Sequence, residues 1–214
     1  MARKRLQRYL AKIGKEFDVV LTEENYKDVI LEEVESPPAL LDYLRDYMEK
    51  NEPTLEWGCL MFLYVKADEE KYVPDIERYY KLLARYPPNW FIEVGMAELQ
   101  LRYYGNIFKA RDGFFKGFEL RPDNAHCYYN LGYVYHLLGV FNKSFEYYEK
   151  AVINHQTANK PKELKARSLY NLAVIEMNVE RDYEEAKRYL KEALAAMPQY
   201  PEAKLALKQI SRWK

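Results

Sequence analysis

The chain has 214 residues, 49% hydrophobic and 31% charged, which is enough to build an ordinary globular core. Its 33 Lys and Arg residues balance its 33 Asp and Glu residues, and this zero net charge gives no global electrostatic argument for nucleic-acid or membrane binding. The longest apolar run, residues 57–65, is too short to span a bilayer, and no secretory signal follows the basic residues 1–8. We therefore expect a protein of the reducing cytoplasm, in which Cys59 and Cys127 are small buried helix residues rather than a disulfide.

Residues 1–17 predict an amphipathic helix. Its apolar residues recur on one face at three- and four-residue spacing: Leu6, Tyr9, Leu10, Ile13 and Phe17. Lys and Arg cover the rest of the helix, and Glu16 is the only acid. Such a helix either seals the end of the protein core or lies on a membrane or an acidic partner, and the sequence favours the first interpretation.

Two more helices are expected before residue 57. Thr22 is an N-cap residue followed by the acidic Glu23 and Glu24, and this helix ends before Pro37. The next helix begins at that proline and runs to Lys50. Residues 1–56 are therefore predicted to form an N-terminal helical cap region or a degenerate repeat.

A spacing of 34 residues organises the rest of the chain. Gly105 and Gly139 are 34 residues apart, as are Pro88 and Pro122, and 34 is the period of a helix–turn–helix repeat. Glycine permits the positive φ of a tight turn between helices, whereas proline ends the preceding helix. No single hairpin buries its apolar face alone, so at least three must stack.

The chain divides into about four such units, 57–90, 91–124, 125–158 and 166–200, followed by a capping helix at 201–214. The unit at 125–158 carries the pattern most completely, through Tyr128, Leu131, Gly132, Tyr135, Gly139, Phe141, Ser144, Tyr148 and Ala151. Small residues in this set let neighbouring helices approach closely, and the large residues interlock between them.

Eight extra residues precede the second helix of the last unit. We place one of them in the turn at 178–182 and seven around 157–165. Pro161 is positioned to begin the next helix early, so that this helix is about one turn longer than its counterparts.

The order of a large residue, Leu-Gly, Tyr, and then small and aromatic positions resembles the tetratricopeptide repeat family. The resemblance implies an all-α fold, a right-handed α-α superhelix with helical caps at both ends. It also implies a non-catalytic protein–protein interaction module, which binds a peptide segment or a helix in its concave groove.

By this resemblance, the first helix of each unit lines the groove. The expected peptide-binding residues are Arg102, Tyr103, His126, Tyr129, Asn130, Tyr133, His136, Arg167, Tyr170, Asn171 and Val174, and the same rule places Ile92, Gly95, Met96 and Leu99 there. Tyrosines offer rigid aromatic area with a polar tip. The asparagines can both donate to and accept from a peptide backbone, and the arginines can pair with a carboxylate.

One subtype of the family is not expected. Chaperone-binding members hold a C-terminal carboxylate with lysines and asparagines. This chain has Met61, Gly95 or Tyr129 where the first lysine of that clamp would stand.

No enzymatic motif stands out. A phosphate loop, a dinucleotide fingerprint, a zinc-protease motif and paired CxxC sequences are all missing. His126 and His136 lie ten residues apart on one expected helix, which separates their backbones by about 15 Å. We expect neither an enzyme nor a bound metal or cofactor.

Two alternatives to a peptide-binding module stay open. A helical-repeat nucleic-acid reader would need a basic face and a regular side-chain code, which the neutral composition does not favour. A self-associating solenoid, such as a homodimer formed through exposed tyrosines, is the other. The abundance of Lys and Glu with little Gln leans towards a heat-loving source.

Overall fold

A computed structural model describes residues 87–158 and 160–211, together with positions 11, 15, 73, 74, 77, 80 and 81. The predicted helices within 1–56, most of the unit at 57–90, and Cys59 lie outside these described residues. The chain divides into two compact units, Met1–Tyr104 and Gly105–Lys214.

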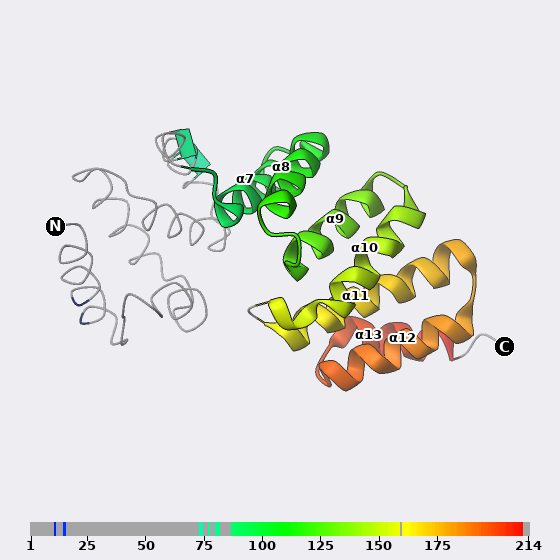
Figure 1. The fold of residues 1–214 in the computed structure, drawn as a ribbon. Coiled ribbons are helices and arrows are strands. Elements are labelled where there is room, and N and C mark those ends of the chain that lie inside the picture. The colour runs from blue at the N-terminus through cyan, green and yellow to red at the C-terminus, as the bar shows by residue number, and fades with distance from the viewer. Residues whose placement is uncertain are drawn as a thin grey trace. The chain divides into compact units, whose positions relative to one another are not determined.

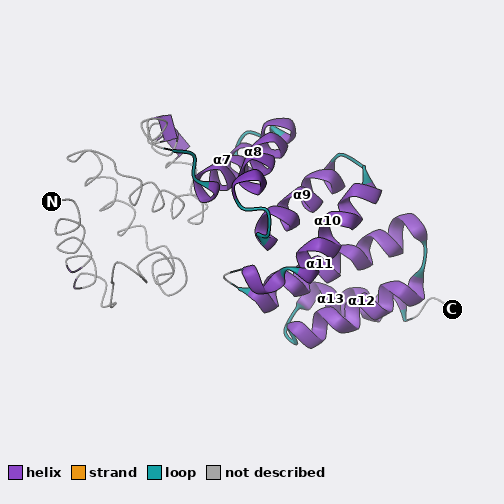
Figure 2. Cartoon of the chain, in the orientation of Figure 1, coloured by secondary structure: helices purple, strands orange, loops and turns teal. Residues whose placement is uncertain are grey.

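All regular secondary structure in the described part of the chain is helical (Figure 2). In the first unit, α7 spans Trp90–Arg102. In the second unit, the α-helices are α8 (Ile107–Leu120), α9 (Ala125–Leu137), α10 (Phe141–Ile153), α11 (Pro161–Ile175), α12 (Tyr183–Ala196) and α13 (Pro201–Ile210). Helix α11 begins at Pro161, as predicted, and is two residues longer than α9 and α10.

Consecutive helices of the second unit pack against one another in chain order (Figure 1). Helix α11 contacts α9 as well as α10 and α12, so the hairpin of α11 and α12 rests on the hairpin of α9 and α10. The prediction of an all-α chain of stacked hairpins is confirmed for this part of the protein.

Close contact between α9 and α10 depends on the absence of a side chain at Gly132. A Cβ atom placed there would lie 2.8 Å from Cδ1 and 2.9 Å from Cε1 of Tyr148, which is fully buried. The Ser144 hydroxyl donates a buried hydrogen bond of 2.9 Å to the Gly132 carbonyl oxygen, which ties the two helices at the same point. Tyr148 and Phe114, one period apart, are the largest fully buried side chains among the described residues.

The turns that precede α8, α10 and α12 each contain a residue in the left-handed backbone conformation. Gly105 and Gly139 have φ values of 60° and 71°, as their spacing predicts. Arg181 has a φ of 61° at the equivalent turn, 42 residues after Gly139. It ends a π-helix at Glu176–Glu180.

This π-helix corrects the predicted position of one inserted residue. The sequence places the extra residue in the 178–182 turn, whereas the structure absorbs it in a wider helical turn that starts at Glu176. The backbone N–H of Arg181 donates to the Glu176 carbonyl oxygen five residues earlier, which is π-type hydrogen bonding.

Replacing Arg181 with glycine is expected to stabilise the second unit by about 0.5–1 kcal/mol. The left-handed conformation costs a residue with a Cβ atom about 1–2 kcal/mol, and the greater chain entropy of glycine offsets part of the gain. Urea denaturation followed by circular dichroism measures the change. Arg181→Ala is the control, because it removes the same side chain but keeps the Cβ atom. Equal stabilisation by both variants would contradict the strain argument.

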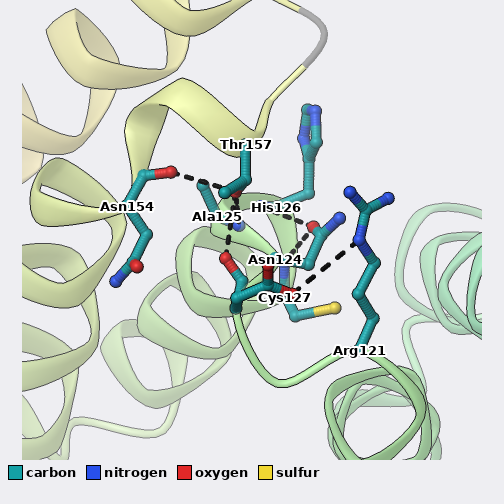
Figure 3. Close-up of polar contacts among 8 residues, drawn as sticks. Arg121, Asn124, Ala125, His126, Cys127, Asn154 and Thr157 are labelled. Atoms are coloured by element: carbon teal, nitrogen blue, oxygen red, sulfur yellow. Dashed lines mark hydrogen bonds and ion pairs between the residues drawn. The ribbon is translucent and has the colours of Figure 1, made fainter.

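The side-chain hydroxyl of Thr157 links the beginning and the end of the repeat that contains α9 and α10 (Figure 3). Thr157 Oγ1 accepts a hydrogen bond of 2.9 Å from the Ala125 backbone N–H. The same hydroxyl lies 3.0 Å from the Asp123 carbonyl oxygen, one 34-residue period away, and 2.9 Å from that of Asn154. Next to it, Asn124 Oδ1 caps α9 by accepting from the backbone N–H of His126. This clasp holds the start of α9 against the 3₁₀-helix His155–Thr157 that follows α10.

Candidate functional site

Five tyrosines from four segments of the second unit come together. We call Tyr129, Tyr133, Tyr148, Tyr170 and Tyr200 the tyrosine cluster. The rings of Tyr129 and Tyr148 lie 5.7 Å apart between centroids, and those of Tyr170 and Tyr200 lie 5.3 Å apart. Tyr133 is close enough to Tyr129 and Tyr148 to act electrostatically on both hydroxyl groups. The stacking of α9, α10 and α11 therefore brings together aromatic residues that are up to 71 positions apart in sequence. Tyr200, directly before α13, is the last of them.

The solvent exposure of the side chains differs across the tyrosine cluster. Tyr148 is fully buried and Tyr133 is 41% exposed. Tyr129, Tyr170 and Tyr200 are partly buried, with their rings packed against the core. The core thus fixes the orientation of these rings, while part of their surface stays accessible to a partner.

Burial governs the ionisation of these hydroxyls. It raises the pKa of Tyr129, although the positive charge of Arg167 and a hydrogen bond to Asn171 oppose the rise. Burial also raises the pKa of Tyr170 and of Tyr200, and the carboxylate of Glu202 adds to both effects. All three phenols therefore keep their proton at neutral pH and can donate hydrogen bonds.

The expected groove residues of α11 lie around this cluster. Asn171 and Arg167 both act on the Tyr129 hydroxyl, and Arg167 also acts on Tyr200. Arg167 Nη2 is already paired with Glu163 Oε1 at 2.8 Å, one helical turn earlier. A carboxylate from a partner would therefore share the guanidinium with Glu163.

Helix α9 also carries His126, Asn130 and His136, which are all partly buried. The ring of His136 meets the ring of Phe141 edge-on at a centroid distance of 5.5 Å, and burial lowers the pKa of this histidine. His136 thus contributes to the packing of α9 on α10. Val174, on α11, is partly buried.

Three positions that the resemblance places in the groove belong to the core instead. Ile92 and Leu99 are 5% and 0% exposed, and Gly95 is buried as well. Apolar side chains at these positions pack inward, so the groove rule is wrong for this part of α7. Arg102 is exposed and Tyr103 partly buried, but both lie in the unit Met1–Tyr104, and their place in a binding site stays a sequence-based prediction.

Sequence reasoning missed four residues at the cluster. Tyr148 was assigned only to packing, and Tyr200 lies outside the first helix of any repeat. Glu163 could have been found, because an acid four residues before Arg167 is the spacing of a helical ion pair. Glu202 stands in the first turn of α13 and becomes relevant only when α13 packs beside α12.

Among the residues that the structure describes, no group of three His, Cys, Asp or Glu side chains could hold a metal ion. None of the helices described is both long and apolar enough to cross a membrane.

Comparison with known proteins gives one family match. Residues 123–199 match the family model described as a tetratricopeptide repeat. The matched segment contains α9 to α12 and four of the five residues of the tyrosine cluster. A comparison with curated proteins gave no match.

Proposed function

Because residues 123–199 match the family model of the tetratricopeptide repeat, we propose that the protein is a non-catalytic interaction module that binds a peptide segment or helix of another protein. Repeats of this family generally mediate protein–protein interaction. The binding surface in this proposal is the accessible part of the tyrosine cluster, which excludes the buried Tyr148, with its polar neighbours Asn130, Arg167 and Asn171. The module would act in the cytoplasm and would need no cofactor.

The convergence of tyrosines carries the proposal. Tyr133 from α9 and Tyr170 from α11 offer aromatic area, and their rings rest on helices that the core already orders. Tyrosine gives a large contact area for a small loss of side-chain freedom, and aromatic residues dominate the energetics of many interfaces. A peptide that covers both rings would therefore gain affinity without requiring the protein to rearrange.

Polar groups beside the rings suit a peptide backbone. Asn171 acts on the Tyr129 hydroxyl, and its amide can both donate and accept hydrogen bonds. Asn130 stands 41 residues earlier at the matching position of α9. An extended peptide exposes donors and acceptors in alternation, so two amides on successive repeats could hold it in one register.

Replacing Tyr133 and Tyr170 together with alanine is expected to weaken peptide binding by about 30-fold or more, because truncating an interface hot spot costs about 2 kcal/mol. The probe is a peptide selected on the wild-type protein from a random display library. Fluorescence anisotropy measures its affinity for each variant, and circular dichroism verifies the fold.

The matched control removes two exposed apolar side chains outside the cluster, Phe108 and Leu205, which are 60% and 58% exposed. This control should bind the peptide as the wild type does. Unchanged binding by the tyrosine variant would overturn the proposed site.

A further inference from the structure

The outward faces of α10 and α12 carry opposite charges at equivalent positions. On α10 the exposed stripe reads Lys143, Glu146, Lys150, and the same positions 42 residues later on α12 read Glu185, Arg188, Glu192. Every charge along the stripe is thus reversed between the two repeats. We call these six residues the charge-reversed stripe.

The six side chains are accessible to a partner. Lys143 is exposed, and the side chains of Glu146 and Lys150 are 58% and 42% exposed. On α12, the side chains of Glu185, Arg188 and Glu192 are 36%, 49% and 45% exposed.

The two helices lie next to each other in the same unit. The rings of Phe145 on α10 and Tyr189 on α12 meet edge-on at a centroid distance of 6.2 Å. The stripe is therefore one surface across two helices.

Each half of the stripe contains an ion pair within its own helix. Lys150 Nζ lies 2.5 Å from Glu146 Oε1, and Arg188 Nη1 lies 2.5 Å from Glu192 Oε1. The order on α10, with Glu before Lys, is the more stabilising one on a helix, and α12 carries the weaker order, so helix stability does not account for the reversal.

The reversed charges of α10 and α12 would match those of a second copy of this chain. In a two-fold dimer, the same surface of both copies forms the interface. Helix α10 of the first copy would then lie on α12 of the second, and α12 of the first on α10 of the second. We propose that the charge-reversed stripe is the interface of a homodimer, in which the lysines of α10 meet the glutamates of α12 in the second copy. The glutamate of α10 meets the arginine of α12 in the same arrangement. Because the pattern reads the same in both directions, the charges match whether the helices run parallel or antiparallel.

Tyr147 borders the stripe on α10. Lys150 Nζ lies 5.5 Å from the centre of its ring, which stacks on that of Tyr135 at 5.5 Å. Exposed ion pairs are individually weak, so the dimer is expected to form at high protein concentration and to dissociate in about 1 M NaCl, where the Debye length is about 3 Å.

Charge-swap variants of the full chain test the interface by sedimentation velocity. Lys143→Glu with Lys150→Glu should be monomeric, since both halves of its stripe are then acidic. Glu185→Lys with Glu192→Lys should be monomeric for the converse reason. An equimolar mixture of the two should restore a dimer, because each stripe then meets its complement.

Controls separate the interface from folding and from general charge effects. Circular dichroism verifies each variant, and Lys143→Gln with Lys150→Gln replaces the first variant if it does not fold. Lys160→Glu with Lys162→Glu changes the net charge equally at the start of α11 and should leave the dimer intact. The proposal would be overturned if the wild-type protein stayed monomeric. It would also be overturned if either charge-swap variant, measured without the other, still formed a dimer.

Discussion

Replacing Gly132 with alanine is expected to destabilise the second unit by about 1–3 kcal/mol, as inserting a methyl group into a tight core does. The new Cβ atom would lie 2.8 Å from the ring of Tyr148, which is fully buried and cannot move aside into solvent. Relief would require α9 and α10 to separate, which would also stretch the hydrogen bond from Ser144 to the Gly132 carbonyl oxygen. Urea denaturation followed by circular dichroism measures the loss.

The next repeat supplies the control for this experiment. There Ala173 stands in place of Gly132, and Leu190 in place of Tyr148, and both are buried. The double variant Gly132→Ala with Tyr148→Leu should therefore be more stable than the sum of the single variants predicts. Contacting residues show coupling of about 0.5–3 kcal/mol in such cycles. Simple additivity would contradict the close approach of the two helices.

Replacing Thr157 with valine is expected to destabilise the second unit by about 1–3 kcal/mol, because valine has nearly the same shape but leaves hydrogen-bonding groups unpaired. Ala125 is fully buried, and its backbone N–H donates to the Thr157 hydroxyl at 2.9 Å. The loss should appear first as faster hydrogen exchange at the start of α9, next to the broken clasp.

Thr157→Ser is the control, since it keeps the hydroxyl and removes only a methyl group. Serine should retain most of the stability and the slow exchange at Ala125. If serine and valine were equally destabilising, the hydrogen bonds of the clasp would not be the cause.

The repeat could be predicted from the sequence because it rests on local rules. The spacing of Gly105 and Gly139 predicted turn residues with positive φ, and Pro161 was placed in the first turn of a helix because a helix interior does not tolerate proline. The small residues Gly132 and Ser144 marked the closest contact of a helix pair. Each of these inferences needs only the chemistry of one residue and its distance from the next.

Other features of the fold and of the candidate site depend on contacts between residues far apart in sequence, which no local pattern contains. The extra residue before Arg181 could be absorbed by a loop or by a π-helix, and packing decides between the two. Ile92 and Leu99 occupy groove positions by their number in the repeat but lie in the core. Tyr200 joins Tyr170 only because α13 folds back on α12.

Hydrogen–deuterium exchange with and without a selected peptide tests the central claim, that a partner binds across the tyrosine cluster. We expect slower exchange in α9 and α11, around Tyr133 and Tyr170, and unchanged exchange at the outward stripe of α10 and α12. Protection confined to α10 and α12, with none in α9 or α11, would contradict it.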